Sequence, residues 1–167
     1  MRIAESLIAE LEREGKSTER ILERVPQDNV DWRPHAKSRT IGELAWHLAT
    51  LPRMGVVGLR EGKRETSGAR PPQRAGSDFV GTFRQSLEEL KTELNATSDE
   101  VLLNEKFSFV RNGEPVLSFP KLGLIRTVIL NHSIHHRGQL SVYLRLLDVP
   151  VPVVYGSTAD EDAFERR

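Results

Sequence analysis

The sequence has no cysteine among its 167 residues. Disulfide bonds, thiolate metal ligands and a cysteine nucleophile are therefore excluded, and any thiol that takes part in its chemistry must come from outside the chain. A chain without cysteine is compatible with a reducing compartment, and we expect a cytoplasmic protein.

The sequence also lacks an excess of one charge and long apolar runs. Lys and Arg together number 24, as do Asp and Glu, so there is no basic excess of the kind that binds nucleic acid or an anionic membrane. No run of about 18 apolar residues occurs, and the N-terminal stretch is charged rather than signal-like. We expect a small-molecule substrate and neither a nucleic-acid nor a membrane partner.

Several enzyme motifs are missing as well. The chain has no P-loop, no Gly-rich dinucleotide turn, no His-Glu-x-x-His motif and no serine nucleophile elbow. Their absence argues against the corresponding nucleotide-binding, zincin and serine-hydrolase classes.

Length and apolar periodicity indicate a single helical domain over residues 1–167. Four segments repeat their apolar residues every three or four positions, which is the helical period. The clearest stripe, in the third helix, reads Val80, Phe83, Leu87, Leu90 and Leu94. The predicted fold class is all-α, a four-helix bundle with a short hairpin or extended excursion before the last long helix.

Local signals set the expected helix boundaries. The first helix ends before Pro26, and the second begins at a capping box formed by Thr40 and Glu43 and passes Pro52 with a kink. The third helix follows Ser77 as its N-cap. The last runs from Pro120 through Leu122 to Leu147.

Two connections have a distinct composition. Apolar stretches 107–110 and 116–119 flank Asn112-Gly113, which predicts the hairpin, with Pro115 confining its second arm to an edge. Residues 61–76 are rich in Gly, Pro, Ser and Arg, and we expect an exposed, mobile loop. Its arginines are Arg64, Arg70 and Arg74. They either meet an anionic group or are solvated; we favour solvation and assign the loop no function.

Three of the five histidines lie where the helical pattern expects buried apolar residues. His132 and His136 occupy the middle of the inward stripe of the last helix, and residues four apart lie one above the other, so their imidazoles can converge. His47 lies on the inward stripe of the second helix. Burying several imidazoles without partners is costly, and one metal ion satisfies all three. We predict that His47, His132 and His136 bind a divalent ion.

The remaining polar residues of this region have competing interpretations. A lone inward histidine is more often a hydrogen-bonded core residue than a ligand. His135 lies on the flank of the stripe, and we interpret it as packing against or supporting the ligands. Gln139 and Asn131 either orient the histidines by hydrogen bonds or face solvent.

Three further residues receive structural interpretations. For Arg137 the simplest interpretation is a salt bridge between helices, and for Gly138 a close packing contact. His35, beside a proline in a turn, is expected at the surface.

Several short motifs, in order along the chain, resemble the DinB-like superfamily of bacterial metal-binding bundles. Residues 131–140 read Asn-His-Ser-Ile-His-His-Arg-Gly-Gln-Leu, residues 143–145 Tyr-Leu-Arg, and residues 151–161 Val-Pro-Val-Val-Tyr-Gly-Ser-Thr-Ala-Asp-Glu. Upstream, residues 30–34 (Val-Asp-Trp-Arg-Pro) and 41–47 (Ile-Gly-Glu-Leu-Ala-Trp-His) are similar to the entry to the second helix of that family.

The resemblance implies a ligand set. In the superfamily, a histidine of the second helix and the two histidines of His-x-x-x-His in the last long helix bind the metal, which corresponds here to His47, His132 and His136. Departures at Asp148, where members often have Gly, and at Ser157-Thr158, where they often have Pro-Ser, affect the C-terminal turn and leave the ligands intact.

The resemblance also implies a range of activities. Some relatives transfer low-molecular-weight thiols such as bacillithiol or mycothiol, or isomerise substrates with them, and relatives are often homodimers. Three neutral imidazoles leave a divalent ion at least one open position, as in catalytic zinc sites.

We therefore expect a metal-dependent hydrolase or thiol S-transferase. Zn or Ni is the first candidate metal, and Fe, Mn or Cu are others. A low-molecular-weight thiol is the candidate cosubstrate, and no residue besides the ligands receives a catalytic role. The alternative is a non-catalytic protein, stabilised by its metal or related to stress.

Overall fold

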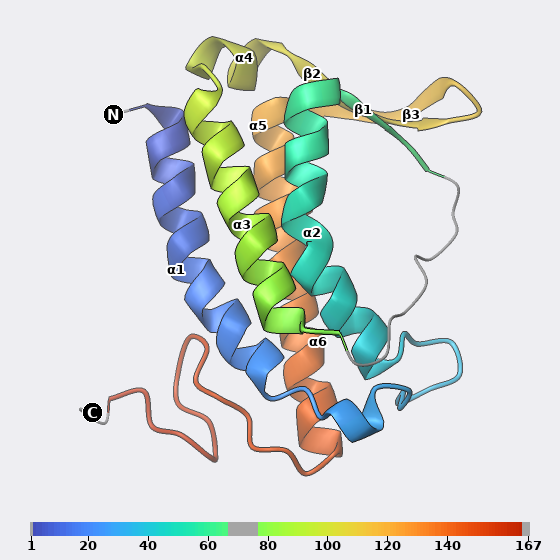
Figure 1. The fold of residues 1–167 in the computed structure, drawn as a ribbon, viewed down its shortest axis with the longest axis vertical. Helices are drawn as coiled ribbons and strands as arrows, with labels where there is room; N and C mark the ends of the chain where they lie inside the picture. Colours follow the sequence, from blue (N-terminus) through green and yellow to red (C-terminus); the bar gives the residue numbers. More distant parts are fainter. Residues whose placement is uncertain (1, 67–76, 165–167) are drawn as a thin grey trace.

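Four long helical segments run along the long axis of the molecule (Figure 1). The structure, a computed structural model, describes residues 2–66 and 77–164. The first three long segments are α1 (Ile3–Glu23), α2 (Ile41–Glu61) and α3 (Phe79–Ala96). The fourth comprises a short helix, α5 (Lys121–Gly123), a π-helix, η2 (Leu124–Asn131), and α6 (His132–Leu146).

These four segments enclose one apolar core. The stripe predicted for the third helix is confirmed: Phe83, Leu87, Leu90 and Leu94 are buried, and Val80 is half-buried. Each fully buried leucine or phenylalanine contributes about 1.5–3 kcal/mol relative to an exposed one. Burial of this stripe therefore holds α3 in the core of the bundle.

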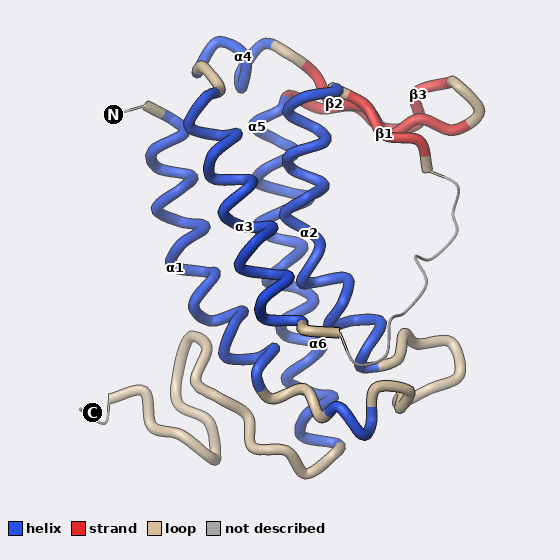
Figure 2. The backbone as a smooth tube through the Cα atoms, viewed as in Figure 1, coloured by secondary structure: helices blue, strands red, loops and turns tan. Residues whose placement is uncertain are grey.

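A small sheet lies at one end of the helices, beside the short helix α4 (Asp99–Asn104) (Figures 1 and 2). Its strand order is β1 (Lys63–Glu65), β2 (Lys106–Arg111) and β3 (Glu114–Pro120). Strands β2 and β3 form an antiparallel hairpin. Both turn residues, Asn112 and Gly113, have positive φ (52° and 83°), the conformation that an Asn-Gly hairpin turn requires. The predicted hairpin is confirmed, and Pro115 lies on an edge strand.

The all-α fold class is confirmed in part. The described residues are mostly helical, but they also form a three-stranded sheet, of which only the hairpin was predicted. Strand β1 pairs in parallel with β2, with Lys63 opposite Ser108 and Glu65 opposite Val110. All three β1 residues are exposed and show no apolar alternation, so only pairing with β2 makes them a strand. The predicted loop at 61–76 is thus partly helix and strand. Residues 67–76, with Arg70 and Arg74, lie outside the described residues.

The N-termini of α2 and α3 are both capped by side chains, as elementary capping rules require. The Thr40 Oγ1 accepts a hydrogen bond from the Glu43 N–H at 3.1 Å, and the Glu43 carboxylate accepts one from the Thr40 N–H at 2.7 Å. The predicted capping box is confirmed, and α2 continues through Pro52. The N-cap of α3 is Asp78 rather than Ser77, because the Asp78 carboxylate accepts from the Gly81 N–H at 2.7 Å.

The last segment departs from the predicted uniform helix. Its middle part, η2, is a π-helix, in which each N–H bonds the carbonyl five residues earlier. The buried residues there recur at the same interval: Leu124 with Ile129, and Ile125 with Leu130. Regular α-helix resumes at His132, so the two histidines of this segment lie in the first turns of α6.

Candidate metal centre

Two helices bring three histidines together. The capping box fixes the start of α2, which places His47 about two turns along that helix. The helix α6 begins at His132 and carries His136 one turn later. The ring centroids of His132 and His136 are 4.3 Å apart, and that of His47 lies 5.2 Å and 4.7 Å from them respectively.

The histidine cluster, defined as His47, His132 and His136, has the dimensions of a metal site. One nitrogen from each imidazole lies within 4.8 Å of the other two. His136 is buried, and the other two are half-buried. This group could hold a divalent ion, as the sequence pattern predicts.

Two nitrogen atoms of the cluster have no hydrogen-bond partner. They are Nε2 of His47 and Nε2 of His136, both buried, and no partner for either exists among the described residues. A buried polar atom without a partner is costly and rare in folded proteins. Two such atoms facing the same space indicate a ligand that accepts nitrogen lone pairs.

Hydrogen bonds to the other ring nitrogens favour an arrangement in which the unpaired nitrogens face a metal ion. The Gln139 Oε1 lies 2.7 Å from the His136 Nδ1, so a proton on Nδ1 is held by the amide oxygen and Nε2 keeps its lone pair. The His132 side chain hydrogen-bonds the backbone of Val128, a residue of η2. Of the two alternatives for these residues, Gln139 contacts the His136 ring although it is exposed, and Asn131 is exposed.

The cluster is kept uncharged by its surroundings. Burial is the main cause that lowers the pKa of His47 to about 3 and that of His136 to about 4, from 6.5. Neighbouring positive charge adds to the effect, including the guanidinium of Arg39 at each site. Burial also lowers the pKa of His132. Neutral imidazoles are the form that binds metals.

The other two histidines stand apart from this arrangement. His135 is exposed, with its ring 5.0 Å from that of His136 and 6.4 Å from that of His132. It does not belong to the group whose nitrogens converge. His35 is exposed, as predicted.

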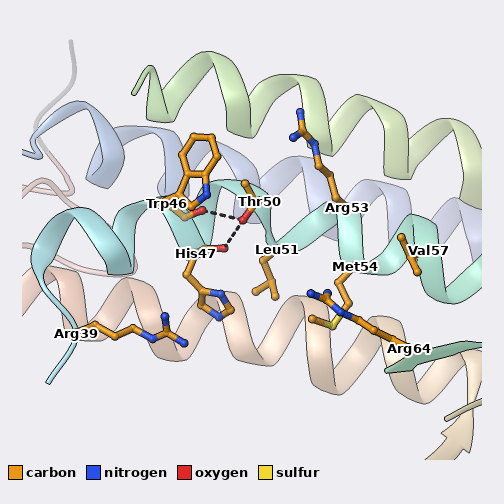
Figure 3. Close-up of a pocket in the computed structure, with 9 residues that line it drawn as sticks. All are labelled: Arg39, Trp46, His47, Thr50, Leu51, Arg53, Met54, Val57 and Arg64. Carbon is orange, nitrogen blue, oxygen red and sulfur yellow. Dashed lines mark hydrogen bonds between the residues drawn. The ribbon is translucent and has the colours of Figure 1, made fainter. Parts of the chain in front are cut away.

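A pocket of about 400 Å³ opens beside His47 (Figure 3). Its lining combines apolar side chains of α2 with polar and basic ones, and comprises Arg39, Trp46, His47, Thr50, Leu51, Arg53, Met54, Val57 and Arg64. The sequence pattern gave Arg64 no function, because a charged residue in a Gly- and Pro-rich stretch usually faces solvent. In the structure, β1 pairs with β2, and Arg64 of β1 lines this pocket.

Next to His136, Arg137 makes the interhelical contact that the sequence suggested. Its side chain is 1% exposed and pairs with the Glu14 carboxylate of α1 at 2.6 Å. The hydroxyl of Tyr155, from the C-terminal segment, donates to the same carboxylate at 2.6 Å. Gly138 has no close packing contact: a methyl group added there would meet no described atom within 4 Å, so that interpretation was wrong.

A membrane-spanning segment is not found in the described residues. No helix within residues 2–66 and 77–164 combines the length and the apolar character that crossing a bilayer requires.

Comparison with known proteins gives consistent matches. The uncharacterized protein YrdA of Bacillus subtilis is 22% identical over 150 residues, which cover 89% of this chain and 85% of YrdA. A crystal structure of a DinB-like protein from Bacillus cereus superposes with a TM-score of 0.71 at 25% identity, covering 90% of this chain and 97% of that one. The DinB-like protein YjoA of Bacillus subtilis superposes with a TM-score of 0.68 at 18% identity, covering 89% and 97%.

The family model described as the DinB family matches residues 1–167. With the helical arrangement, the superpositions and this match along the whole chain in agreement, the chain belongs to the DinB family.

Proposed function

We propose that this protein binds one divalent ion through His47, His132 and His136 and acts as a metal-dependent hydrolase or thiol S-transferase on a small molecule. The observation that carries the proposal is the pair of buried Nε2 atoms without hydrogen-bond partners, on His47 and His136. Imidazole nitrogen suits Zn²⁺ and Ni²⁺ first, and also Fe²⁺, Mn²⁺ or Cu²⁺.

Three protein ligands leave an open coordination position, which is the arrangement of catalytic sites rather than closed structural ones. A bound ion would supply Lewis acidity, which makes a water or a thiol more acidic near neutral pH. The chain has no cysteine, so in a thiol transfer the thiol is a second substrate.

The chain's own residues have defined tasks in such a site. Gln139 holds the proton on Nδ1 of His136 and so keeps Nε2 available. Burial keeps His47 and His136 neutral, and the pocket beside His47 gives a small molecule access to the cluster.

The first test is elemental analysis of untagged protein. We expect about one ion per chain in the wild type and none in the His132→Ala/His136→Ala double variant. The control is His135→Ala, which removes an exposed imidazole next to the cluster and should keep the ion. A wild type that takes up no Zn²⁺, Ni²⁺ or Fe²⁺ would contradict the proposal.

The second test separates the two reactions. Metal-loaded protein is assayed for hydrolysis of p-nitrophenyl acetate, and for transfer of added L-cysteine to 1-chloro-2,4-dinitrobenzene. A rate that depends on the ion and is absent in the double variant supports catalysis of that type. Metal binding with neither activity favours the non-catalytic alternative.

That alternative has one specific observation in its favour. The histidine cluster joins two helices, α2 and α6, so an ion there would also link them and add its binding free energy to folding. Chelation should then lower the melting temperature sharply. An enzyme site should tolerate chelation better and should bind added thiols when loaded.

A further inference from the structure

We propose that the pocket beside His47 selects a small organic anion with an acidic group at each end, one group bound by Arg39 and the other by Arg64. The inference rests on the proposed function for its chemistry, since it names the substrate class of that site. Its binding step depends only on residues of the pocket.

The two arginines flank the helix that carries His47. Arg39 lies just before the start of α2, and Arg64 lies in β1, just after α2 ends. Figure 3 shows their side chains extending toward the His47 ring from opposite sides, with Leu51 between His47 and Arg64. The parallel pairing of Arg64 with Phe109 of β2 holds its backbone at that place.

The described lining of this pocket is basic. It includes Arg39, Arg53 and Arg64, and no carboxylate is among the described residues that line it. Arg64 forms no ion pair with any described residue, and the neighbouring Glu65 carboxylate instead accepts a hydrogen bond from the Asn112 N–H at 2.8 Å. Arg39 and Arg64 line the same pocket as His47, so both guanidinium groups border the space beside that ring (Figure 3).

Arg53 lines the same pocket but differs in direction. Its guanidinium points toward α3 (Figure 3), where it lies 3.4 Å from the Gln85 Oε1 and 3.9 Å from the Glu89 carboxylate. Arg53 thus carries the same charge as the two proposed ligand-binding arginines without facing the histidine. It provides a matched control.

The wall between the two arginines suits a hydrocarbon spacer. Leu51, Met54 and Val57 form the apolar side of the pocket along α2. A volume of about 400 Å³ is enough for a molecule of several carbon atoms. Arginine binds carboxylate with two parallel hydrogen bonds, which fixes the orientation of the bound acid as well as its charge.

The test uses isothermal titration calorimetry to measure the binding of three probes. They have the same carbon skeleton and carry two, one or no negative charges. They are succinate, its monoamide succinamate and its diamide succinamide. We expect succinate to bind at least about tenfold more tightly than succinamate, and succinamide not to bind measurably. Arg39→Gln and Arg64→Gln should each lower succinate affinity by about tenfold or more, and Arg53→Gln should leave it unchanged.

Lysine variants keep the test conclusive if a glutamine variant does not fold. Arg39→Lys and Arg64→Lys retain the charge but lose the planar pair of donors, so we expect intermediate affinities. Equal affinity for the three probes would overturn the inference. So would succinate binding that is indifferent to the Arg39 and Arg64 variants or that falls equally in Arg53→Gln.

The same titration on the His132→Ala/His136→Ala variant separates this inference from the proposed function. Arginine-dependent succinate binding that persists there supports the anion pocket whether or not the wild type holds an ion. If succinate binding needs the two histidines and not the arginines, the anion binds at the ion alone, and the inference fails while the metal proposal stands.

Discussion

At the scale of single residues, the charge state of the histidine cluster links the site to stability. His47 and His136 have pKa values of about 3 and 4 in the folded protein, against 6.5 for a free imidazole. The unfolded chain therefore binds protons as the pH falls below 6.5, while the folded chain does not until a much lower pH. By linkage, stability is fully present above 6.5 and is lost as the pH falls toward 3–4.

We therefore predict that the metal-free protein melts at a progressively lower temperature as the pH is lowered from 7 to 4. A His47→Gln/His136→Gln variant cannot take up these protons and should show a shallower dependence. Thermal melts of the chelated proteins at unit pH intervals check this. Parallel curves for wild type and variant would show that other groups govern acid sensitivity.

Sequence alone identified the cluster at this scale but not its surroundings. His47, His132 and His136 interrupt apolar stripes, and a polar residue on an apolar stripe is a visible signal. Arg64 gives no such signal, because its place depends on a three-residue strand that is paired only through tertiary contact.

At the scale of elements, glycines set how closely α2 approaches its neighbours. A β-carbon added at Gly58 would lie 2.1 Å from the Leu124 Cδ2 and 3.1 Å from the Phe107 Cδ2. Both partners are fully buried, so neither side chain has open space to move into. The contact between α2 and the start of η2 therefore requires a residue without a side chain.

We predict that Gly58→Ala destabilises the protein by about 1–3 kcal/mol through overpacking. Gly138→Ala is the matched control, because a methyl group there meets no described atom within 4 Å. Gly138 lies in the middle of α6, so Gly138→Ala should raise the free energy of unfolding by up to about 1 kcal/mol, since alanine has a higher helix propensity than glycine. Urea denaturation of the two variants gives both values, and equal effects would refute this account of the packing.

The long helices and the capping box of α2 were predictable from the sequence, whereas the N-cap of α3 and the π-helical type of η2 were not. The Thr40–Glu43 capping box is a short-range pattern with a known mechanism, so it was found. The π-helix η2 was read as ordinary helix because apolar residues are dense there and fit a period of three or four as well as one of five.

At the scale of the whole molecule, the C-terminal segment is fastened across the helices by buried charge. Arg137 of α6 contacts Glu14 of α1 and Tyr155 of the segment after α6, and its guanidinium lies 4.9 Å from the centre of the Tyr155 ring. Farther along, the Glu161 carboxylate pairs with Arg20 and Arg24 of the first helix region. These contacts join residues far apart in sequence, and the segment after α6 lies on the side of the molecule away from the sheet (Figure 1).

We predict that Arg137→Ala destabilises the protein by about 3–5 kcal/mol, because it removes the buried cation of an ion pair and leaves the half-buried Glu14 carboxylate with the Tyr155 hydroxyl in place of a charged partner. Tyr155→Phe, which removes one hydroxyl, should cost about 1 kcal/mol. Arg126→Ala breaks an exposed pair with Glu10 and should cost at most about 1 kcal/mol. Denaturant unfolding checks the three values.

Hydrogen exchange can locate the effect of the first two changes. Protection should fall first in residues 149–164 if the segment is held by this network. Loss of protection spread evenly over the helices would instead place the contribution of Arg137 in the bundle itself.

The π-helix has a consequence for how this chain aligns with others. A π-helical turn contains roughly one residue more than an α-helical turn. Because of the eight residues of η2, the chain between Pro120, at the end of the sheet, and His132 contains more residues than an α-helix of the same length would. A relative whose last helix is α-helical throughout can match both the hairpin and the histidines only with a gap between residues 124 and 131. Within η2, a single-residue insertion or deletion can be accommodated by a change between π-helix and α-helix, without moving His132 and His136.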